Sequence, residues 1–183
     1  MRNEVIFAGF GGQGVVKAAL LLSYAAGLYE DKEVAQTQSY GPEARGGACR
    51  SEVVISDMEI DYIKTSHNVD AFVVMSQPAM DKYAGKIDRA GTVVIADSTL
   101  VKNIPDDFKH VYRVAATKTA EEELGKALFA NIVMLGALSG LTRLVDLSSL
   151  EKSLEGNVPP KTTAINKKAL ALGYAIAESL KQP

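Results

Sequence analysis

The chain has 183 residues, 47% of them hydrophobic and 23% charged, which suits one globular domain of ordinary size. Its 20 basic and 22 acidic residues give a formal net charge of -2, which argues against non-specific nucleic-acid binding because that needs a strong cationic field. One cysteine, Cys49, cannot form an internal disulfide or hold an iron–sulfur cluster alone, and the two histidines share no ligand spacing, so we expect no bound metal.

The amino-terminal apolar run is too short for a signal peptide, and Glu4 interrupts it. A long uncharged stretch from Ala127 to Leu141 falls short of the roughly 20 apolar residues that span a bilayer. We therefore expect a cytoplasmic protein that does not associate with membranes. No linker or repeat divides the chain, so residues 1–183 are expected to form a single domain.

The first third of the chain predicts a strand, a helix and a second strand. Val5 to Ala8 is a short apolar run before a glycine cluster, which is typical of a strand buried on both faces. Val15 to Leu28 is rich in Ala and Leu and predicts a helix. Glu33 to Thr37 predicts the second strand, and the glycines and proline of Ser39 to Gly47 indicate a loop after it.

Further apolar runs predict the rest of the sheet. Two of them end in polar or turn residues, Ser76–Gln77–Pro78 and Asp97–Ser98–Thr99, as buried strands do when they end at one edge of a sheet. The predicted strands are Cys49 to Ile55, Ala71 to Met75, Thr92 to Ala96 and Val111 to Val114.

The carboxy-terminal third is expected to be helical. Thr119 with Glu122, and Ser148 with Glu151, have the spacing of a capping box, and Gly156 is expected to end the second of these helices. A last helix follows two prolines, with an apolar stripe at Ile165, Ala169, Leu172, Ile176 and Leu180. The fold class is therefore α/β: a three-layer, Rossmann-like domain with a mostly parallel sheet and a helical carboxy-terminal third.

The segment Gly9 to Gly14 matches G-x-G-x-x-G between a predicted strand and a predicted helix, which is the context the motif requires. Its glycines let the backbone turn tightly and approach a ligand closely. The free N–H groups and the dipole of the helix start then favour an anion such as a phosphate. The alternative is a tight turn that packs helix on strand and binds nothing.

A dinucleotide would require Asp or Glu about 20 residues after the loop, at the end of the second strand. That strand instead ends in Ala35-Gln36-Thr37-Gln38, which weakens the dinucleotide interpretation. Gln13 can donate to and accept from a ligand, or bond a neighbouring loop. Lys17, one helical turn on, can reach an anion at the helix start or remain solvated.

A second loop, Tyr40 to Gly47, follows the second strand and is expected at the carboxyl edge of the sheet beside the glycine loop. Arg45, followed by Gly46 and Gly47, could place its guanidinium on a phosphate or on a partner's carboxylate. Spacing alone favours the alternative of a salt-bridged surface arginine.

Four segments stand out when taken together: GFGGQGVV at 9–16, TQSYGPEARGG at 37–47, SEVVIS at 51–56 and NIVMLGAL at 131–138. The glycine loop is weak evidence alone, but it is specific when YGPEARGG follows in this order and at this separation. Together these segments resemble the gamma subunit of 2-oxoacid:ferredoxin (acceptor) oxidoreductases, most closely of the 2-oxoglutarate type.

The resemblance implies a role within a larger enzyme. Such enzymes decarboxylate a 2-oxoacid on thiamine diphosphate, pass electrons through iron–sulfur clusters to ferredoxin or flavodoxin, and transfer the acyl group to coenzyme A. Alpha and beta subunits carry thiamine diphosphate with its Mg²⁺, the clusters lie on beta or on a ferredoxin-like delta subunit, and the gamma subunit closes over coenzyme A. Carried over by position, the expected coenzyme-binding residues here are Gly9, Gly11, Gly12, Gln13, Gly14, Arg45, Gly46 and Asn131.

The sequence offers no nucleophile–base pair or carboxylate pair, so no catalytic residue is assigned. We therefore predict a non-catalytic but necessary subunit that contributes to coenzyme A binding and assembly, is inactive alone, and forms a homodimer when isolated. For Asn131, a buried amide satisfied by the backbone is an equally good interpretation. Two other functions remain open: a stand-alone NAD(P)-binding oxidoreductase, and a purely structural assembly subunit.

Overall fold

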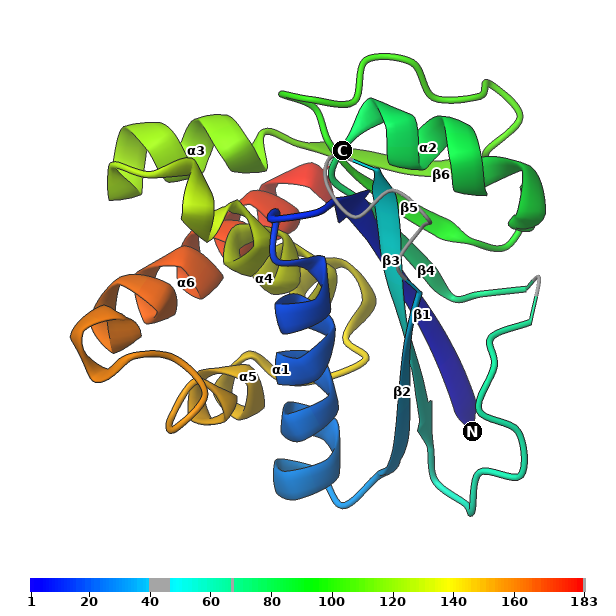
Figure 1. The fold of residues 1–183 in the computed structure, drawn as a ribbon, viewed down its shortest axis with the longest axis horizontal. Coiled ribbons are helices and arrows are strands. Elements are labelled where there is room, and N and C mark those ends of the chain that lie inside the picture. Colours follow the sequence, from blue (N-terminus) through cyan, green and yellow to red (C-terminus); the bar gives the residue numbers. More distant parts are fainter. Residues whose placement is uncertain (40–46, 67, 183) are drawn as a thin grey trace.

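The computed structural model describes residues 1–39, 47–66 and 68–182, which form a three-layer α/β domain (Figure 1). Among them is one six-stranded sheet in the order β2-β3-β1-β4-β5-β6. The strands are β1 (Arg2–Phe10), β2 (Glu33–Ser39), β3 (Ala48–Ser56), β4 (Ala71–Val74), β5 (Val93–Asp97) and β6 (His110–Val114). The helices are α1 (Val15–Tyr29), α2 (Gln77–Tyr83), α3 (Ala116–Leu124), α4 (Ala130–Thr142), α5 (Leu147–Ser153) and α6 (Thr163–Leu180).

The sheet is parallel on one side of β1 and antiparallel on the other. β1, β4, β5 and β6 pair in parallel, whereas β3 pairs antiparallel with both β1 and β2. The α/β fold, the predicted strands and the helical carboxy-terminal third are thus confirmed. Because β2 runs in the same direction as β1, its end meets the end of β1 at the carboxyl edge: Ser39 pairs with Arg50, and Phe10 with Ala48.

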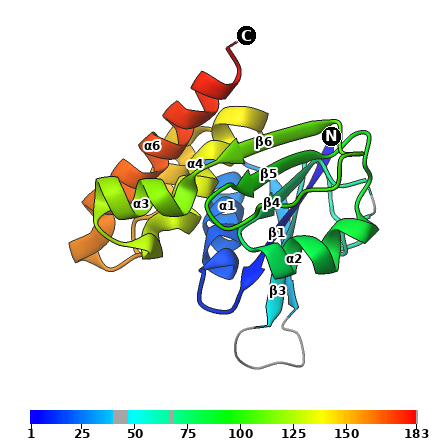
Figure 2. The same ribbon diagram turned by 90° about the horizontal axis from the view of Figure 1, so that it is seen from above.

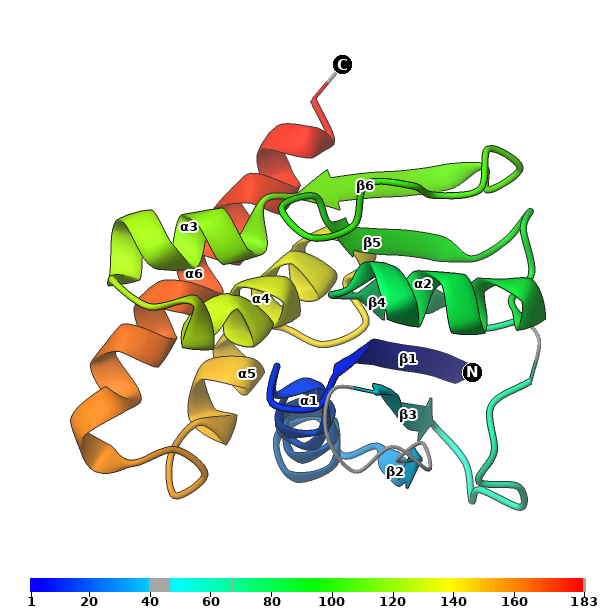
Figure 3. The same ribbon diagram turned by 45° about the horizontal axis from the view of Figure 1, so that its top comes forward.

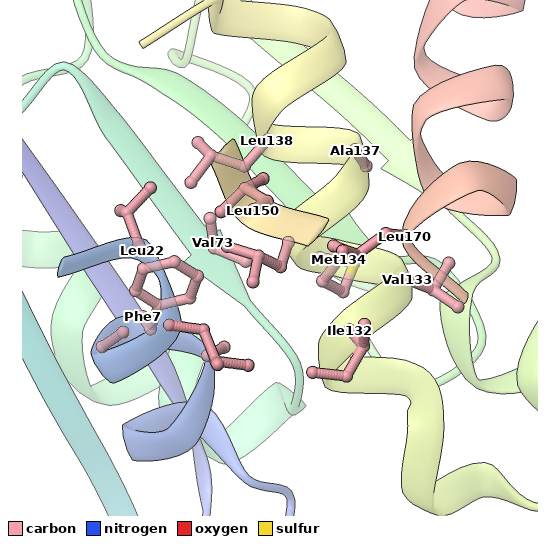
Figure 4. Close-up of a cluster of buried hydrophobic side chains, with 14 of the residues drawn as sticks. Phe7, Leu22, Val73, Ile132, Val133, Met134, Ala137, Leu138, Leu150 and Leu170 are labelled. Atoms are coloured by element: carbon pink, nitrogen blue, oxygen red, sulfur yellow. The ribbon is translucent and has the colours of Figure 1, made fainter. Parts of the chain in front are cut away.

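The two faces of the sheet are covered unequally. Side chains on one face, including Ile6 and Phe72, pack against α2. Those on the other, including Phe7 and Val73, pack with α1 and α4, around which α5 and α6 complete the layer (Figure 4). The helix α1 is apolar nearly all round because it lies between the sheet and other helices. No described helix is long and apolar enough to cross a membrane.

The residues Ser76–Gln77–Pro78, which were expected to follow the end of a strand, also begin the helix α2. Ser76 is the N-cap of α2, and its Oγ accepts a hydrogen bond from the Ala79 amide at 3.3 Å. Pro78 lies in the first turn, where its missing N–H costs nothing. The same residues that end a strand therefore also begin a helix.

Both predicted capping boxes are wrong. Thr119 lies inside α3, and Ser148 lies inside α5, which begins at Leu147. The start of α3 is instead held by the end of β5: the Asp97 carboxylate accepts from the Thr117 amide at 3.2 Å and from Thr117 Oγ1 at 2.5 Å. A buried carboxylate distant in sequence thus replaces the local cap.

The predicted apolar stripe of α6 is confirmed in part. Ala169 is buried, and Ile165, Leu172 and Ile176 are partly buried against the core, whereas Leu180 is exposed. The fully buried face of α6 consists of Asn166, Ala169, Leu170, Gly173 and Ala177. The reason is close contact with α4, where Gly136 faces the Leu170 carbonyl and Gly173 faces the Val133 carbonyl. Gly136 and Gly173 thus let the two helix backbones approach each other closely.

Candidate functional site

The glycine loop connects β1 to α1 through a tight turn at the carboxyl edge of the sheet. The Gln13 amide donates to the Phe10 carbonyl at 3.2 Å. Gly12 has φ of 102°, and Gly14, the N-cap of α1, has φ of 73°. Residues with a Cβ rarely adopt this left-handed region, so the turn requires glycine at both positions.

The loop lies beside the point where the sheet reverses its order. From β1 the chain passes through α1 toward β2, and from β4 it passes through α2 toward β5, on the opposite side of the sheet order. Figure 2 and Figure 3 show α1 and α2 on opposite faces of the sheet. In open α/β sheets the crevice at such a point, here between the ends of β1 and β4, is the usual place for a ligand.

The side chain of Gln13 bridges this crevice. Its Oε1 accepts from the Phe10 amide at 2.8 Å, and its Nε2 donates to the Met75 carbonyl at 2.7 Å. A Cβ added at Gly9 would lie 2.5 Å from Gln13 Oε1, so Gly9 leaves the space that this side chain takes. Gln13 therefore joins the ends of β1 and β4 instead of projecting into solvent.

Asn131 connects the loop to α4. Its side chain is 6% exposed, and its Nδ2 donates to the Gly14 carbonyl at 3.1 Å. A Cβ at Gly14 would lie 2.5 Å from Asn131 Nδ2, so Gly14 is required by the close contact as well as by its φ. The structure thus places Gly9, Gly11, Gly12, Gln13, Gly14 and Asn131 together.

Backbone donors at the start of α1 remain available. The leading amides of any helix lack an intrahelical partner, and here neither a side-chain cap at Gly14 nor an acidic residue in the first turn of α1 satisfies them. Within the described parts of the chain, the amides of Gly11 and Gly12 also make no backbone hydrogen bond outside regular elements. These donors and the helix dipole together favour an anion.

Phe10, which is 39% exposed, lines two hollows. One, of about 400 Å³, is lined by the loop glycines, Val16, Lys17, Leu20 and Cys49. The other, of about 180 Å³, is lined by Gln13, Met75, Leu100 and Leu128 among others. Both are mainly apolar. Lys17, the charged residue in the lining of the larger hollow, makes no hydrogen bond or ion pair with another described residue.

Cys49 borders the larger hollow, but its chemistry is inert. The residue is buried, and desolvation raises the pKa of its thiol above the ordinary value of 9.0. A thiol of this kind is protonated near neutral pH and is a poor nucleophile. No group of three His, Cys, Asp or Glu side chains within the described residues could hold a metal ion.

Of the second loop, only Ser39 and Gly47 at its two ends lie within the described residues. Ser39 ends β2 and Gly47 precedes β3 at the carboxyl edge, where Phe10 at the end of β1 pairs with Ala48. The predicted ligand residues Arg45 and Gly46 lie outside the described residues. Sequence reasoning did not identify Phe10 or Leu128 as site residues, because an exposed apolar side chain in a loop carries no pattern of its own.

The sequence pattern of the pyruvate ferredoxin/flavodoxin oxidoreductase family matches residues 4–176. The chain is 47% identical to the 2-oxoglutarate synthase subunit KorC of Methanocaldococcus jannaschii, over 98% of this chain and 96% of that one. It is 36% identical to the gamma subunit of a keto/oxoacid ferredoxin oxidoreductase from Geobacter sulfurreducens, with a TM-score of 0.89, and the match covers 100% of this chain and 99% of that one.

A third protein shares the fold at lower identity. It is the 2-oxoglutarate:ferredoxin oxidoreductase of Magnetococcus marinus, whose structure contains 2-oxoglutarate, coenzyme A and succinyl-CoA. The match has a TM-score of 0.83 and 24% identity, and it covers 100% of this chain but 32% of that one. The same fold therefore also occurs as one part of a longer chain.

Proposed function

Because the chain belongs to the pyruvate ferredoxin/flavodoxin oxidoreductase family, we propose that it is the gamma subunit of a thiamine-dependent 2-oxoglutarate:ferredoxin oxidoreductase and that its glycine loop contacts coenzyme A. The observation that carries the assignment is the 47% identity to a KorC subunit over nearly the whole of both chains. The complex would convert 2-oxoglutarate to its acyl-CoA and pass electrons to ferredoxin or flavodoxin.

The chemistry of the site suits coenzyme A. The free amides at Gly11, Gly12 and the start of α1, with Lys17 nearby, suit a phosphate group. The apolar hollows beside Phe10 suit the pantetheine arm, which is uncharged. Asn131 and Gln13 would support the loop, and Arg45 and Gly46 of the second loop would complete the site.

The other steps of the reaction belong to other subunits. We assign thiamine diphosphate with its Mg²⁺ to alpha and beta subunits, and iron–sulfur clusters to beta or to a ferredoxin-like delta subunit. Three large apolar side chains of the segment after β3, Met58, Tyr62 and Ile63, are more than half exposed, as expected of a chain that assembles with partners. The same exposure favours self-association of the free chain.

One observation favours a second candidate, a purely structural subunit. The amide groups of Gln13 and Asn131 are engaged within the protein, as they would be in a loop that only packs α1 on the sheet. A stand-alone NAD(P) enzyme fits less well, because Gln13 bridges the crevice and β2 ends in Gln38 and Ser39 without a carboxylate for a ribose.

Gly11 provides the test of coenzyme A binding. A Cβ at Gly11 would meet nothing within 4 Å, and its φ is not in the left-handed region, so Gly11→Val adds bulk at the ligand's side of the loop without strain. Gly85→Val is the matched control, because a Cβ added at Gly85 also meets nothing within 4 Å. Gly85 lies outside the glycine loop, in the short 3-10 helix of residues 84–86 that follows α2. Both variants should fold and assemble.

The readout is steady-state kinetics of the assembled complex, with coenzyme A varied at saturating 2-oxoglutarate. Gly11→Val should raise the KM for coenzyme A by about tenfold or more, which corresponds to about 1.4 kcal/mol of lost binding. Gly85→Val should leave it unchanged. An intact Gly11→Val complex with ordinary coenzyme A dependence would favour the structural subunit instead.

A further inference from the structure

The side-chain amide of Gln13 has an unusual place in this fold, since it occupies the crevice where open α/β sheets usually receive their ligand. We propose that Gln13 is a positioning residue: it joins the ends of β1 and β4 across the crevice and thereby fixes the glycine loop with its free amides on the outer side. The inference rests on the proposed function, because coenzyme A is the ligand for which the loop is positioned.

Both ends of the amide are needed for this role. The Phe10 amide donates to Oε1 at 2.8 Å, and Nε2 donates to the Met75 carbonyl at 2.7 Å. The Met75 amide in turn donates to the Ala8 carbonyl at 2.8 Å, so the bridge extends the pairing of β1 and β4 by one step. Only a side chain with an acceptor, a donor and the length of glutamine satisfies both strand ends.

The hydrogen bonds of the Gln13 side chain also determine which backbone amides of the loop face outward. The amides of Phe10 and Gln13 are used within the turn, to Gln13 Oε1 and to the Phe10 carbonyl. Gly12 lines both hollows and Gly11 lines the larger one. A Cβ added at either glycine would meet nothing within 4 Å. The turn is therefore formed before a ligand arrives, which reduces the conformational entropy lost on binding.

The variants that test this are Gln13→Met and Gln13→Asn in the assembled complex. Methionine matches the length of glutamine but makes neither bond, and asparagine keeps the amide but is one methylene too short to reach both partners. Gln77→Met is the matched control, because Gln77 also ties backbone together, with Oε1 accepting from Lys102 and Asn103 amides at 2.9 Å, outside the glycine loop.

If Gln13 positions the loop, Gln13→Met and Gln13→Asn should each raise the KM for coenzyme A about tenfold, the effect of losing one or two net hydrogen bonds. The KM for 2-oxoglutarate should stay unchanged, as should the rate at saturating coenzyme A. Gln77→Met should alter neither KM. A merely structural defect would instead lower the amount of active complex and leave both KM values as they are, which would overturn the proposal.

A second measurement needs no variant. Residue-resolved hydrogen exchange of the wild-type complex without coenzyme A should show the Phe10 amide protected and the Gly11 and Gly12 amides exchanging fast. Equal exchange at all three would overturn the proposal even if the variants failed to assemble. If Gly11→Val raises the KM for coenzyme A but the Gln13 variants do not, this inference fails alone. If none of them does, the proposed function fails with it.

Discussion

Replacing Gly14 by alanine tests how firmly the start of α1 is held against α4. Gly14 has φ of 73°, and an added Cβ would lie 2.5 Å from Asn131 Nδ2 and 3.0 Å from Asn131 Cγ. The left-handed backbone costs a non-glycine residue about 1–2 kcal/mol. Displacing the buried Asn131 amide from the Gly14 carbonyl adds about 1–3 kcal/mol. We expect Gly14→Ala to lower the free energy of unfolding by about 2–5 kcal/mol.

A double-mutant cycle separates the two contributions. In an Asn131→Ala background the clashing amide is absent, so Gly14→Ala should cost only the backbone share of about 1–2 kcal/mol. Gly156→Ala is the control for backbone strain, because Gly156 has φ of 74° with nothing within 4 Å of an added Cβ. The assay is urea unfolding followed by circular dichroism. The reasoning is refuted if Gly14→Ala costs the same in both backgrounds, or no more than Gly156→Ala.

The amino terminus and the contact between α4 and α6 give two further predictions. Hydrogen bonds from Lys32 and the terminal amine, aided by their charges, lower the pKa of Asp57 from 3.8 to about 2, so its contribution to stability is present above pH 3.8 and is lost as the pH falls toward 2. Asp57→Asn should flatten the fall of the thermal midpoint in that window, and a fall as steep as the wild type's would contradict this. Gly173→Ala should destabilise by about 3 kcal/mol in urea unfolding, although alanine usually strengthens a helix, because its Cβ would strike the Val133 carbonyl. A Gly173→Ala variant more stable than the wild type would show that α4 and α6 can move apart enough to accommodate the added Cβ.

The sheet was predictable from sequence because its strands are short apolar runs that end in turn residues. β4 and β5 are buried along almost their whole length, and the glycine loop follows β1 where the motif placed it. The antiparallel place of β3 between β1 and β2 was not evident, since a buried strand has the same apolar pattern in either direction.

The wrong predictions share one physical origin. Tertiary contacts determine where a helix begins and which of its faces is buried, although both are usually predicted from the local sequence pattern. The start of α3 depends on Asp97, twenty residues before Thr117, and not on the nearby Thr119. The buried face of α6 centres on Gly173, whose importance comes from having no side chain and which therefore carries no hydrophobic signal.

The sequence singled out several of the residues that lie at the glycine loop, but it did not predict what their side chains contact. The motif identified Gln13 and the resemblance identified Asn131, yet sequence could not distinguish contact with a ligand from a bond to the backbone. The structure shows backbone bonds for both amides, from Gln13 to Met75 and from Asn131 to Gly14.

The dependence of α3 on β5 bears on the order in which the chain folds. The first turn of α3 has its Thr117 amide bound by Asp97 and its Lys118 amide bound by Thr99 at 3.2 Å, so these donors have partners only once the end of β5 is in place. A nine-residue helix without such partners is marginal in water. A peptide of this segment should therefore be largely unstructured, and α3 should form after β5 has joined the sheet.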